Sequence, residues 1–274
     1  MNELLSLVLA LQPIALDPGR TEFPRWWGRA AQAALLEVVN QRDAALAVEL
    51  HAESTLRPYT VSNLMGRFAR GNGAPLMDQS YSLRWTGLTE PVSAALMSFA
   101  DTAAGQTLEL DHVPFRVLAA ASKPEEQPWA GSASYTALGG RYLAGLDTPR
   151  RVTFQLTSPV VFKSGGLTQP LPEAGLVFHS LLERWNRFAP LALPPEVRRF
   201  SEECLALSRF ELKSRPVPLK EGGLRIGSVG RVTFTATNPD KFWLGQVHTL
   251  AAFAQFAGLG AGTAQGLGQA RVIA

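Results

Sequence analysis

The chain has 274 residues, of which 46% are hydrophobic and 18% charged, and its formal net charge is +3 at pH 7. This composition, with no long block of like charges, excludes an intrinsically disordered protein and is typical of a globular one. The length predicts two domains, each large enough to bury its own core.

The N-terminal run MNELLSLVLALQPIAL predicts a buried strand over residues 4–11. A secretory signal would need a positively charged start, whereas the early charge here is Glu3. No other run approaches the roughly 18 apolar residues that a membrane helix requires, so we expect no membrane partner. The single cysteine, Cys204, cannot form an internal disulfide, and a cytoplasmic location is expected.

The rest of the first half predicts two helices among strands. The apolar spacing of EFPRWWGRAAQAALLEVVNQ predicts a helix from about Pro24, and TEPVSAALMSFADTAAG predicts a second one between an N-cap at Thr89 and Gly105. Strands are predicted for RPYTVSNL, SYSLRWTGL and QTLELDHVPFRVLAAAS. The order strand, helix, strand, strand, helix, strand is the split pattern of a ferredoxin-like domain.

The second half repeats this order without detectable sequence identity to the first. Strands are predicted for RRVTFQLTSPVVF, LALSRFELKSRPVPL, RIGSVGRVTFTAT and GQARVIA, and helices for PEAGLVFHSLLERWNRFAP and DKFWLGQVHTLAAFAQFAG. The sequence therefore predicts an α+β protein of two tandem ferredoxin-like βαββαβ domains. We expect the domains at residues 1–146 and 147–274, with the boundary near Gly145 to Pro149.

The two halves differ in charge. Residues 1–146 carry 11 Lys and Arg against 14 Asp and Glu, a net charge of −3, whereas residues 147–274 carry 15 against 9, a net charge of +6. A basic second half permits a polyanionic partner such as a nucleic acid, although many surface arginines are simply solvated.

The most unusual segment is glycine-rich and lies near the carboxyl end. Its five glycines within eleven residues are Gly258, Gly260, Gly262, Gly266 and Gly268. The dinucleotide fingerprint is excluded because Thr263 stands at its third glycine and the segment follows a helix. The phosphate loop of nucleotide triphosphatases is excluded because no lysine follows Lys241. Two interpretations stay open: backbone amides that bind RNA phosphates, or a tight crossover packed against the sheet.

This ending resembles a known family. A helix followed by GLGAGTAQGLGQARV resembles the C-terminal signature of the repeat-associated (RAMP) superfamily, and is similar to the CRISPR-associated endoribonucleases that cut precursor CRISPR RNA within its repeats. The stretches LTSPVVF, LPEAGLVFHSLLERWNRFAP and LHAESTLRPYTVSNLMG resemble other parts of that family, so the likeness covers nearly the whole chain. The resemblance implies tandem RRM-like domains, CRISPR repeat RNA as partner and no cofactor. It leaves open a homodimer and association with subunits of a CRISPR effector complex.

Metal-free RNA cleavage needs a base for the 2′-hydroxyl, an acid for the departing 5′-oxygen, and positive charge at the phosphate. The chain has four histidines, and His179, His248 and His112 lie in patterns typical of packed helices or strands. His51 lies where a helical stretch ends, six residues before Arg57, which resembles the family's catalytic histidine and the basic residue that follows it. Arg57 stays charged, so it could hold the phosphate but not donate a proton.

The acid is not identified by the sequence. Tyr59 and Ser62 are candidates by position, while a tyrosine that some relatives carry on the preceding helix is missing from residues 29–41. From residue chemistry alone, each of these residues could equally be structural.

For RNA binding we expect the amides of the glycine-rich segment with Thr263 and Gln265, and the cations Lys163, Arg150 and Arg151. Trp85 and Trp129 could stack on bases or pack in a core. No metal site is expected, because the histidines and the cysteine lack ligand spacing.

The sequence thus predicts a metal-independent endoribonuclease that leaves a 2′,3′-cyclic or 3′-phosphate. Two alternatives remain: a non-catalytic guide-RNA-binding subunit of an effector complex, and a two-domain protein that binds a small molecule.

Overall fold

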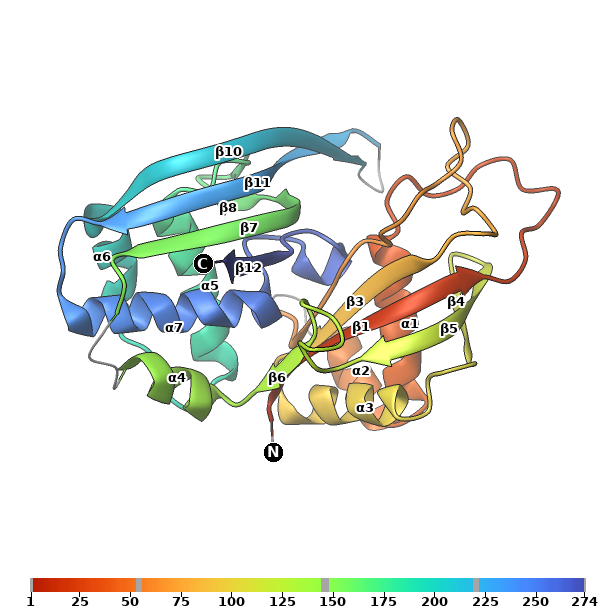
Figure 1. Cartoon of the computed structure of the whole chain (residues 1–274), viewed down its shortest axis with the longest axis horizontal. Helices are drawn as coiled ribbons and strands as arrows, with labels where there is room; N and C mark the ends of the chain where they lie inside the picture. The colour runs from red at the N-terminus through yellow and green to blue at the C-terminus, as the bar shows by residue number, and fades with distance from the viewer. Residues whose placement is uncertain (1, 53–55, 144–147, 219–221, 274) are drawn as a thin grey trace. The chain divides into compact units, whose positions relative to one another are not determined.

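The computed structural model describes residues 2–52, 56–143, 148–218 and 222–273. Its contacts form two compact units (Figure 1). Unit 1 comprises Met1–Ser132 together with Ala264–Gly266, and unit 2 comprises Ala133–Thr263 together with Leu267–Ala274. Three residues of the glycine-rich segment therefore belong to the first unit.

Unit 1 is built on an antiparallel sheet. Its elements are β1 (Leu4–Pro13), α1 (Gly28–Asn40), α2 (Ala44–Ala52), β2 (Tyr59–Val61), β3 (Tyr81–Gly87), α3 (Glu90–Ala100), β4 (Thr107–Leu110), β5 (Val113–Ala121) and β6 (Gly131–Ala133). The strand order is β2-β3-β1-β5-β4, with β6 pairing to β1. With β1 and β3 central and β2 and β5 outside them, this is the ferredoxin-like arrangement.

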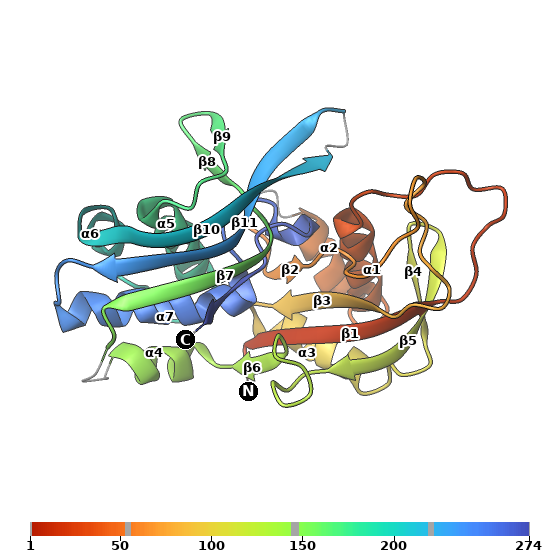
Figure 2. The same cartoon turned by 45° about the horizontal axis from the view of Figure 1, so that its top comes forward.

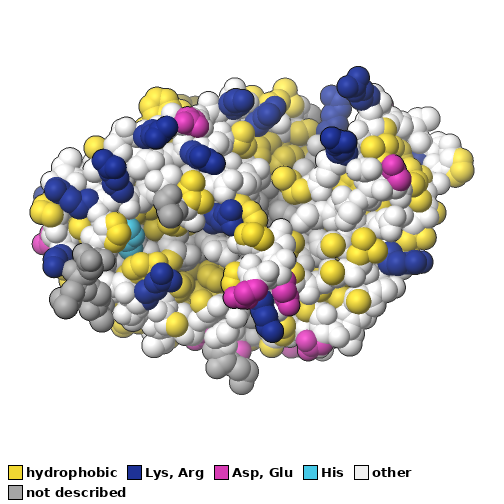
Figure 3. Space-filling model, in the orientation of Figure 1, with side chains coloured by type: hydrophobic (Ala, Val, Ile, Leu, Met, Phe, Trp, Pro, Cys, Tyr) yellow, Lys and Arg dark blue, Asp and Glu magenta, His cyan; other side chains and the backbone are white. Residues whose placement is uncertain are grey.

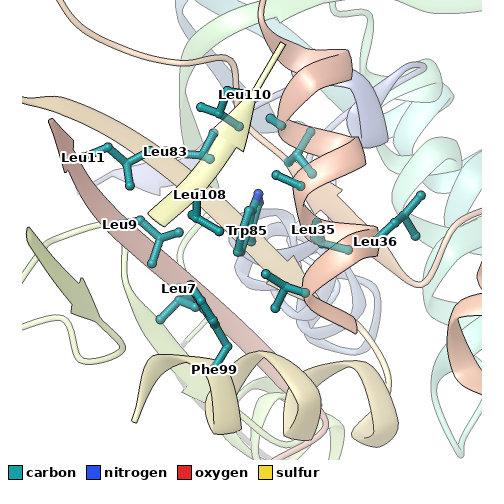
Figure 4. Close-up of a cluster of buried hydrophobic side chains, with 14 of the residues drawn as sticks. Leu7, Leu9, Leu11, Leu35, Leu36, Leu83, Trp85, Phe99, Leu108 and Leu110 are labelled. Carbon is teal, nitrogen blue, oxygen red and sulfur yellow. The ribbon is translucent and has the colours of Figure 1, made fainter. Parts of the chain in front are cut away.

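The core of unit 1 follows from the alternation of side chains along a strand. Leu5, Leu7, Leu9 and Leu11 of β1 are all buried on one face of the sheet. Figure 4 shows three of these leucines together with Trp85, beside residues of α1 and the labelled Phe99. Trp85 is fully buried, so it belongs to this core and is not available to stack on RNA.

Unit 2 repeats the topology. Its elements are α4 (Tyr135–Leu143), β7 (Arg151–Val160), β8 (Phe162–Ser164), β9 (Leu167–Gln169), α5 (Ala174–Phe188), α6 (Glu196–Cys204), β10 (Leu205–Pro218), β11 (Leu224–Ala236), α7 (Lys241–Ala257) and β12 (Ala270–Ile273). The strand order is β10-β11-β7-β12, and Phe178 of α5 packs on Phe154 and Phe234 of the sheet. In Figure 2 the long β10–β11 hairpin and the short β8–β9 hairpin both extend beyond the sheet. The predicted tandem ferredoxin-like α+β fold is confirmed.

Some boundaries differ from those expected. The expected domain boundary near Gly145 lies outside the described residues, and the contacts divide earlier, between Ser132 and Ala133. The reason is α4, which packs on α7: the Tyr135 ring lies 5.6 Å from that of Phe253. The segment QTLELDHVPFRVLAAAS, predicted as one strand, forms the two strands of the hairpin β4–β5 instead. In its turn, Asp111 and His112 have positive φ angles of 48° and 61°.

None of the helices in the described ranges has the length and apolar character needed to span a bilayer.

Candidate functional site

A pocket of about 520 Å³ lies in unit 1 beside α1 and α2. It brings together three of the predicted catalytic residues, and its polar lining consists of Arg29, Gln32, Glu37, Asn40, His51, Arg57 and Tyr59. The pocket thus joins a histidine, a tyrosine and two arginines, which is the set of groups that acid–base chemistry on an anionic substrate requires.

The imidazole is placed by a pair of helices joined by a tight turn. Asp43 begins α2, because its side chain accepts a hydrogen bond from the amide of Leu46 at 2.9 Å, as an N-cap residue does. From there α2 returns along α1, so His51 in its last turn lies beside Arg29 and Gln32 in the first half of α1. The His51 side chain is exposed and therefore accessible to a ligand.

Arg57 is half-buried and holds the end of the same helix. Its Nη1 donates to the carbonyl of Leu50, the residue before His51. The last carbonyls of a helix have no partner within the helix, so a guanidinium is well suited to this position. Arg57 both lines the pocket and fixes the backbone that carries His51.

Tyr59 forms the inner wall of the pocket. Its side chain is fully buried, and its hydroxyl accepts a hydrogen bond of 2.9 Å from Nε2 of Gln32. Ser62 is not part of this wall. It is buried, its hydroxyl donates to the carbonyl of Asn63, and it accepts from the amide of Arg84, both at 2.8 Å.

Most glycines of the glycine-rich segment are closely packed within unit 2. A Cβ on Gly260 would lie 2.1 Å from the carbonyl oxygen of Val161, and one on Gly268 would lie 2.2 Å from that of Leu259. These glycines and Gly258 are buried with positive φ angles, so close packing alone explains their presence. The accessible part is the loop tip, which we define as residues 261–265; in it the side chain of Gln265 is exposed.

The end of this loop contacts the first turn of α1, within unit 1. The carbonyl oxygen of Gln265 accepts a hydrogen bond from Nε1 of Trp26 at 2.7 Å and lies 1.9 Å from the position of a Cβ on Gly28. Gly266 pairs with Ser62 in a parallel bridge. Because α1 also lines the pocket, one helix connects the loop to His51.

The structure places the other predicted RNA-binding cations at opposite ends of β7. Lys163 is exposed in β8, two residues beyond Val161, which contacts the loop. Arg150 and Arg151 lie at the opposite end of β7, a strand that extends over about 30 Å, and Arg150 donates to the carbonyl of Thr237. The Thr263 hydroxyl is buried and faces a guanidinium from α5.

Trp129, which could have stacked on a base, is partly buried beneath the guanidinium of Arg84, 4.9 Å from the ring centroid.

The other three histidines do not line this pocket. His248 is 8% exposed, and burial lowers its pKa despite the bond between its Nε2 and the carbonyl of Pro149. His179 lies 3.7 Å from Glu183 on the surface of α5. His112 is exposed in the β4–β5 turn.

Sequence analysis missed three residues. Arg29 and Gln32 lie three positions apart on the exposed side of α1, a spacing that places them next to each other at the pocket. Arg184 is buried among the apolar residues of α5. Arg184 follows Leu181 by three positions and so lies on the apolar face of that helix, and this spacing could have predicted its burial.

Unit 2 carries the basic surface predicted for the second half. Figure 3 shows Lys and Arg side chains over β10 and β11. Exposed cations on these strands are Arg209, Lys213, Arg215 and Arg231. Within the described ranges, no group of three or more His, Cys, Asp or Glu side chains could hold a metal ion.

Comparisons with known proteins agree with this picture. The profile of the family CRISPR-associated endoribonuclease Cas6 matches residues 154–270. The Cas6 (TTHA0078) product complex is 27% identical with a TM-score of 0.78, and 99% of each chain is covered. The Cas6 (TTHB231) product complex, whose protein is from Thermus thermophilus, is 25% identical with a TM-score of 0.77 over 100% of each chain.

A RAMP protein that binds different RNA substrates shares the fold alone, with 14% identity and a TM-score of 0.59 over 98% of this chain and 100% of its own. A search of curated proteins found no match. The predicted family resemblance is confirmed: the ferredoxin-like units, the family match across the glycine-rich loop and the full-length likeness to Cas6 structures support a CRISPR-associated RNA-processing protein of the RAMP type.

Proposed function

We propose that the chain cuts precursor CRISPR RNA within its repeats, without a metal ion, by attack of a 2′-hydroxyl on the adjacent phosphate. The family match and the Cas6 structures support an endoribonuclease that acts on CRISPR RNA. The observation that carries the finer proposal is the pocket of unit 1, where His51, Arg57 and Tyr59 meet beside a helix that also contacts the glycine-rich loop.

Each pocket residue has one role in this proposal. His51 takes the proton of the attacking 2′-hydroxyl, a task that suits an exposed imidazole near neutral pH. Arg57 and Arg29 stabilise the negative charge that develops on the phosphate. Tyr59 is fully buried, so its hydroxyl orients Gln32 at the pocket, and the proton for the departing 5′-oxygen comes from solvent water. Ser62 has no catalytic role in this proposal, because its hydroxyl already bonds the backbone on two sides.

The RNA backbone would lie along the loop tip. Gln265 is exposed there, and Lys163 is near the same end of β7. The backbone contacts of Gly258, Gly260 and Gly268 shape the loop from within, while Gly262 lies in its tip and Gly266 directly follows the tip. Arg150 and Arg151 would bind RNA apart from the loop tip, since they lie at the other end of β7.

The direct test incubates the purified protein with repeat RNA transcribed from the CRISPR array of its own genome, in excess EDTA. We expect one cut per repeat, a 2′,3′-cyclic or 3′-phosphate on the upstream fragment and a 5′-hydroxyl on the downstream one, as mapped by mass spectrometry. A scrambled repeat is the control. Binding without cutting would instead identify a guide-RNA-binding subunit. Cutting that requires Mg²⁺ and leaves a 3′-hydroxyl would exclude the proposed mechanism.

Gly28→Ala tests the link between the loop and α1. Alanine normally favours a helix over glycine by about 1 kcal/mol, but here its Cβ would lie 1.9 Å from the Gln265 carbonyl oxygen. The loop end must therefore shift, and a displacement of about 1 Å near a catalytic site can cost about 10²-fold in rate. We expect a loss of that order in the single-turnover cleavage rate.

The matched control is Gly140→Ala in α4, where nothing lies within 4 Å of the added Cβ. It should leave cleavage unchanged. Equal rates for Gly28→Ala and the wild type would show that the contact between the loop and α1 has no part in catalysis.

A further inference from the structure

Arg184 of α5 lies directly beneath the loop tip. Its side chain is 6% exposed, and its Nη2 donates to the carbonyl oxygen of Gly260 at 2.5 Å and to the hydroxyl of Thr263 at 3.4 Å. Its Nη1 donates to the carbonyl oxygen of Ser180 at 3.0 Å, and the Ser180 hydroxyl accepts from the amide of Gly260 at 3.2 Å. The guanidinium thus ties α5 to the loop from its buried side.

This cation is buried without a carboxylate partner. Arg184 forms no ion pair with any residue in the described ranges; the neighbouring Glu183 is about half exposed and lies beside His179. Burial lowers the pKa of Arg184 to about 10, although the charge of the nearby Glu183 opposes this shift, and the guanidinium stays charged at neutral pH. A buried, unpaired charge costs stability, and apolar residues of similar size are often more stable in such places.

Hydrogen bonding alone does not explain why a charged residue is buried at this position. A neutral amide could also donate to the Gly260 carbonyl without the cost of burying a cation. What a cation adds is positive potential at the loop tip, and this potential is weakly screened by salt because its source is buried. An anion bound at residues 261–265 would benefit from it directly.

We propose that Arg184 is a positioning residue whose buried positive charge strengthens the binding of an RNA phosphate by the loop tip, without touching the RNA. This inference rests on the proposed function, in which the tip binds the RNA backbone. At an effective dielectric constant of about 20, the attraction between two unit charges roughly one Debye length apart corresponds to about tenfold in affinity.

The test compares Arg184→Lys with Arg184→Gln. Both variants lose the planar fork of the guanidinium, but only lysine keeps the positive charge. The measurement is made at pH 6, which favours the protonated form of the lysine. The dissociation constant is measured for the genomic repeat RNA whose scissile 2′-hydroxyl is replaced by hydrogen, so that cleavage does not interfere. We expect Arg184→Gln to weaken binding about tenfold and Arg184→Lys by no more than about threefold.

Phe178→Leu controls for simple destabilisation, because Phe178 is buried on the same helix but packs on Phe154 and Phe234. It should lower the unfolding temperature and leave affinity unchanged. If Arg184→Gln does not fold, Arg184→Met supplies the neutral variant. Equal affinities for the charged and neutral variants would overturn the inference, whereas a wild-type protein that does not bind the RNA would overturn the proposed function itself.

Discussion

Replacing His51 with alanine is expected to lower the single-turnover rate of repeat cleavage by about 10³-fold, within the range of general acid–base catalysis, while RNA affinity is retained. The imidazole is exposed at the end of α2, so its removal leaves no buried cavity. The hydrogen bond from Arg57 to the Leu50 carbonyl also remains, because it involves the backbone before His51. The rate is measured on labelled repeat RNA with enzyme in excess, and affinity on the uncleavable 2′-deoxy analogue.

His112→Ala is the matched control, since His112 is also exposed but lies in the β4–β5 turn and does not line the pocket. This variant should cut at the wild-type rate. Normal cleavage by His51→Ala would remove His51 from the mechanism, and a parallel loss of RNA affinity would make it a binding residue.

Replacing the scissile 2′-hydroxyl of the repeat RNA with hydrogen is expected to reduce cleavage below detection, because that hydroxyl is the proposed nucleophile. Binding should persist, since the proposed protein contacts at the loop tip are with the phosphate backbone. Gel electrophoresis of the labelled RNA after long incubation measures the cut, and a filter-binding assay measures affinity.

The same substitution one nucleotide away is the control and should leave cleavage at that phosphate intact. A cut in the RNA that lacks the scissile hydroxyl would identify water or hydroxide as the nucleophile. In that case His51 could still act as a base, but the products would end in a 3′-hydroxyl or a linear phosphate rather than a cyclic one.

The sequence left two uses of glycine in this loop as alternatives, and the structure supports close packing for most of these residues. Gly260 and Gly268 are required by close backbone packing, as a tight crossover would be. The tip between them is nevertheless accessible, and Gln265 is exposed there. Packing therefore explains most of the glycines, while the proposed role in RNA binding belongs to the short segment that they hold in place.

The sequence by itself determined the order of strands and helices and hence the fold class, because apolar periodicity is a local property of neighbouring residues. It also placed His51, Arg57 and Tyr59 together, since these residues are close along the chain. The composition of the glycine-rich segment was enough to make it a candidate site.

Only the tertiary structure decided which distant segments meet. It brought Gln265 to the first turn of α1, engaged both sides of the Ser62 hydroxyl, and buried Arg184 under the loop. It also separated Arg151 from that loop by the length of β7. Such contacts depend on how elements pack around a common core, and no local pattern of residues specifies the partner that packing selects.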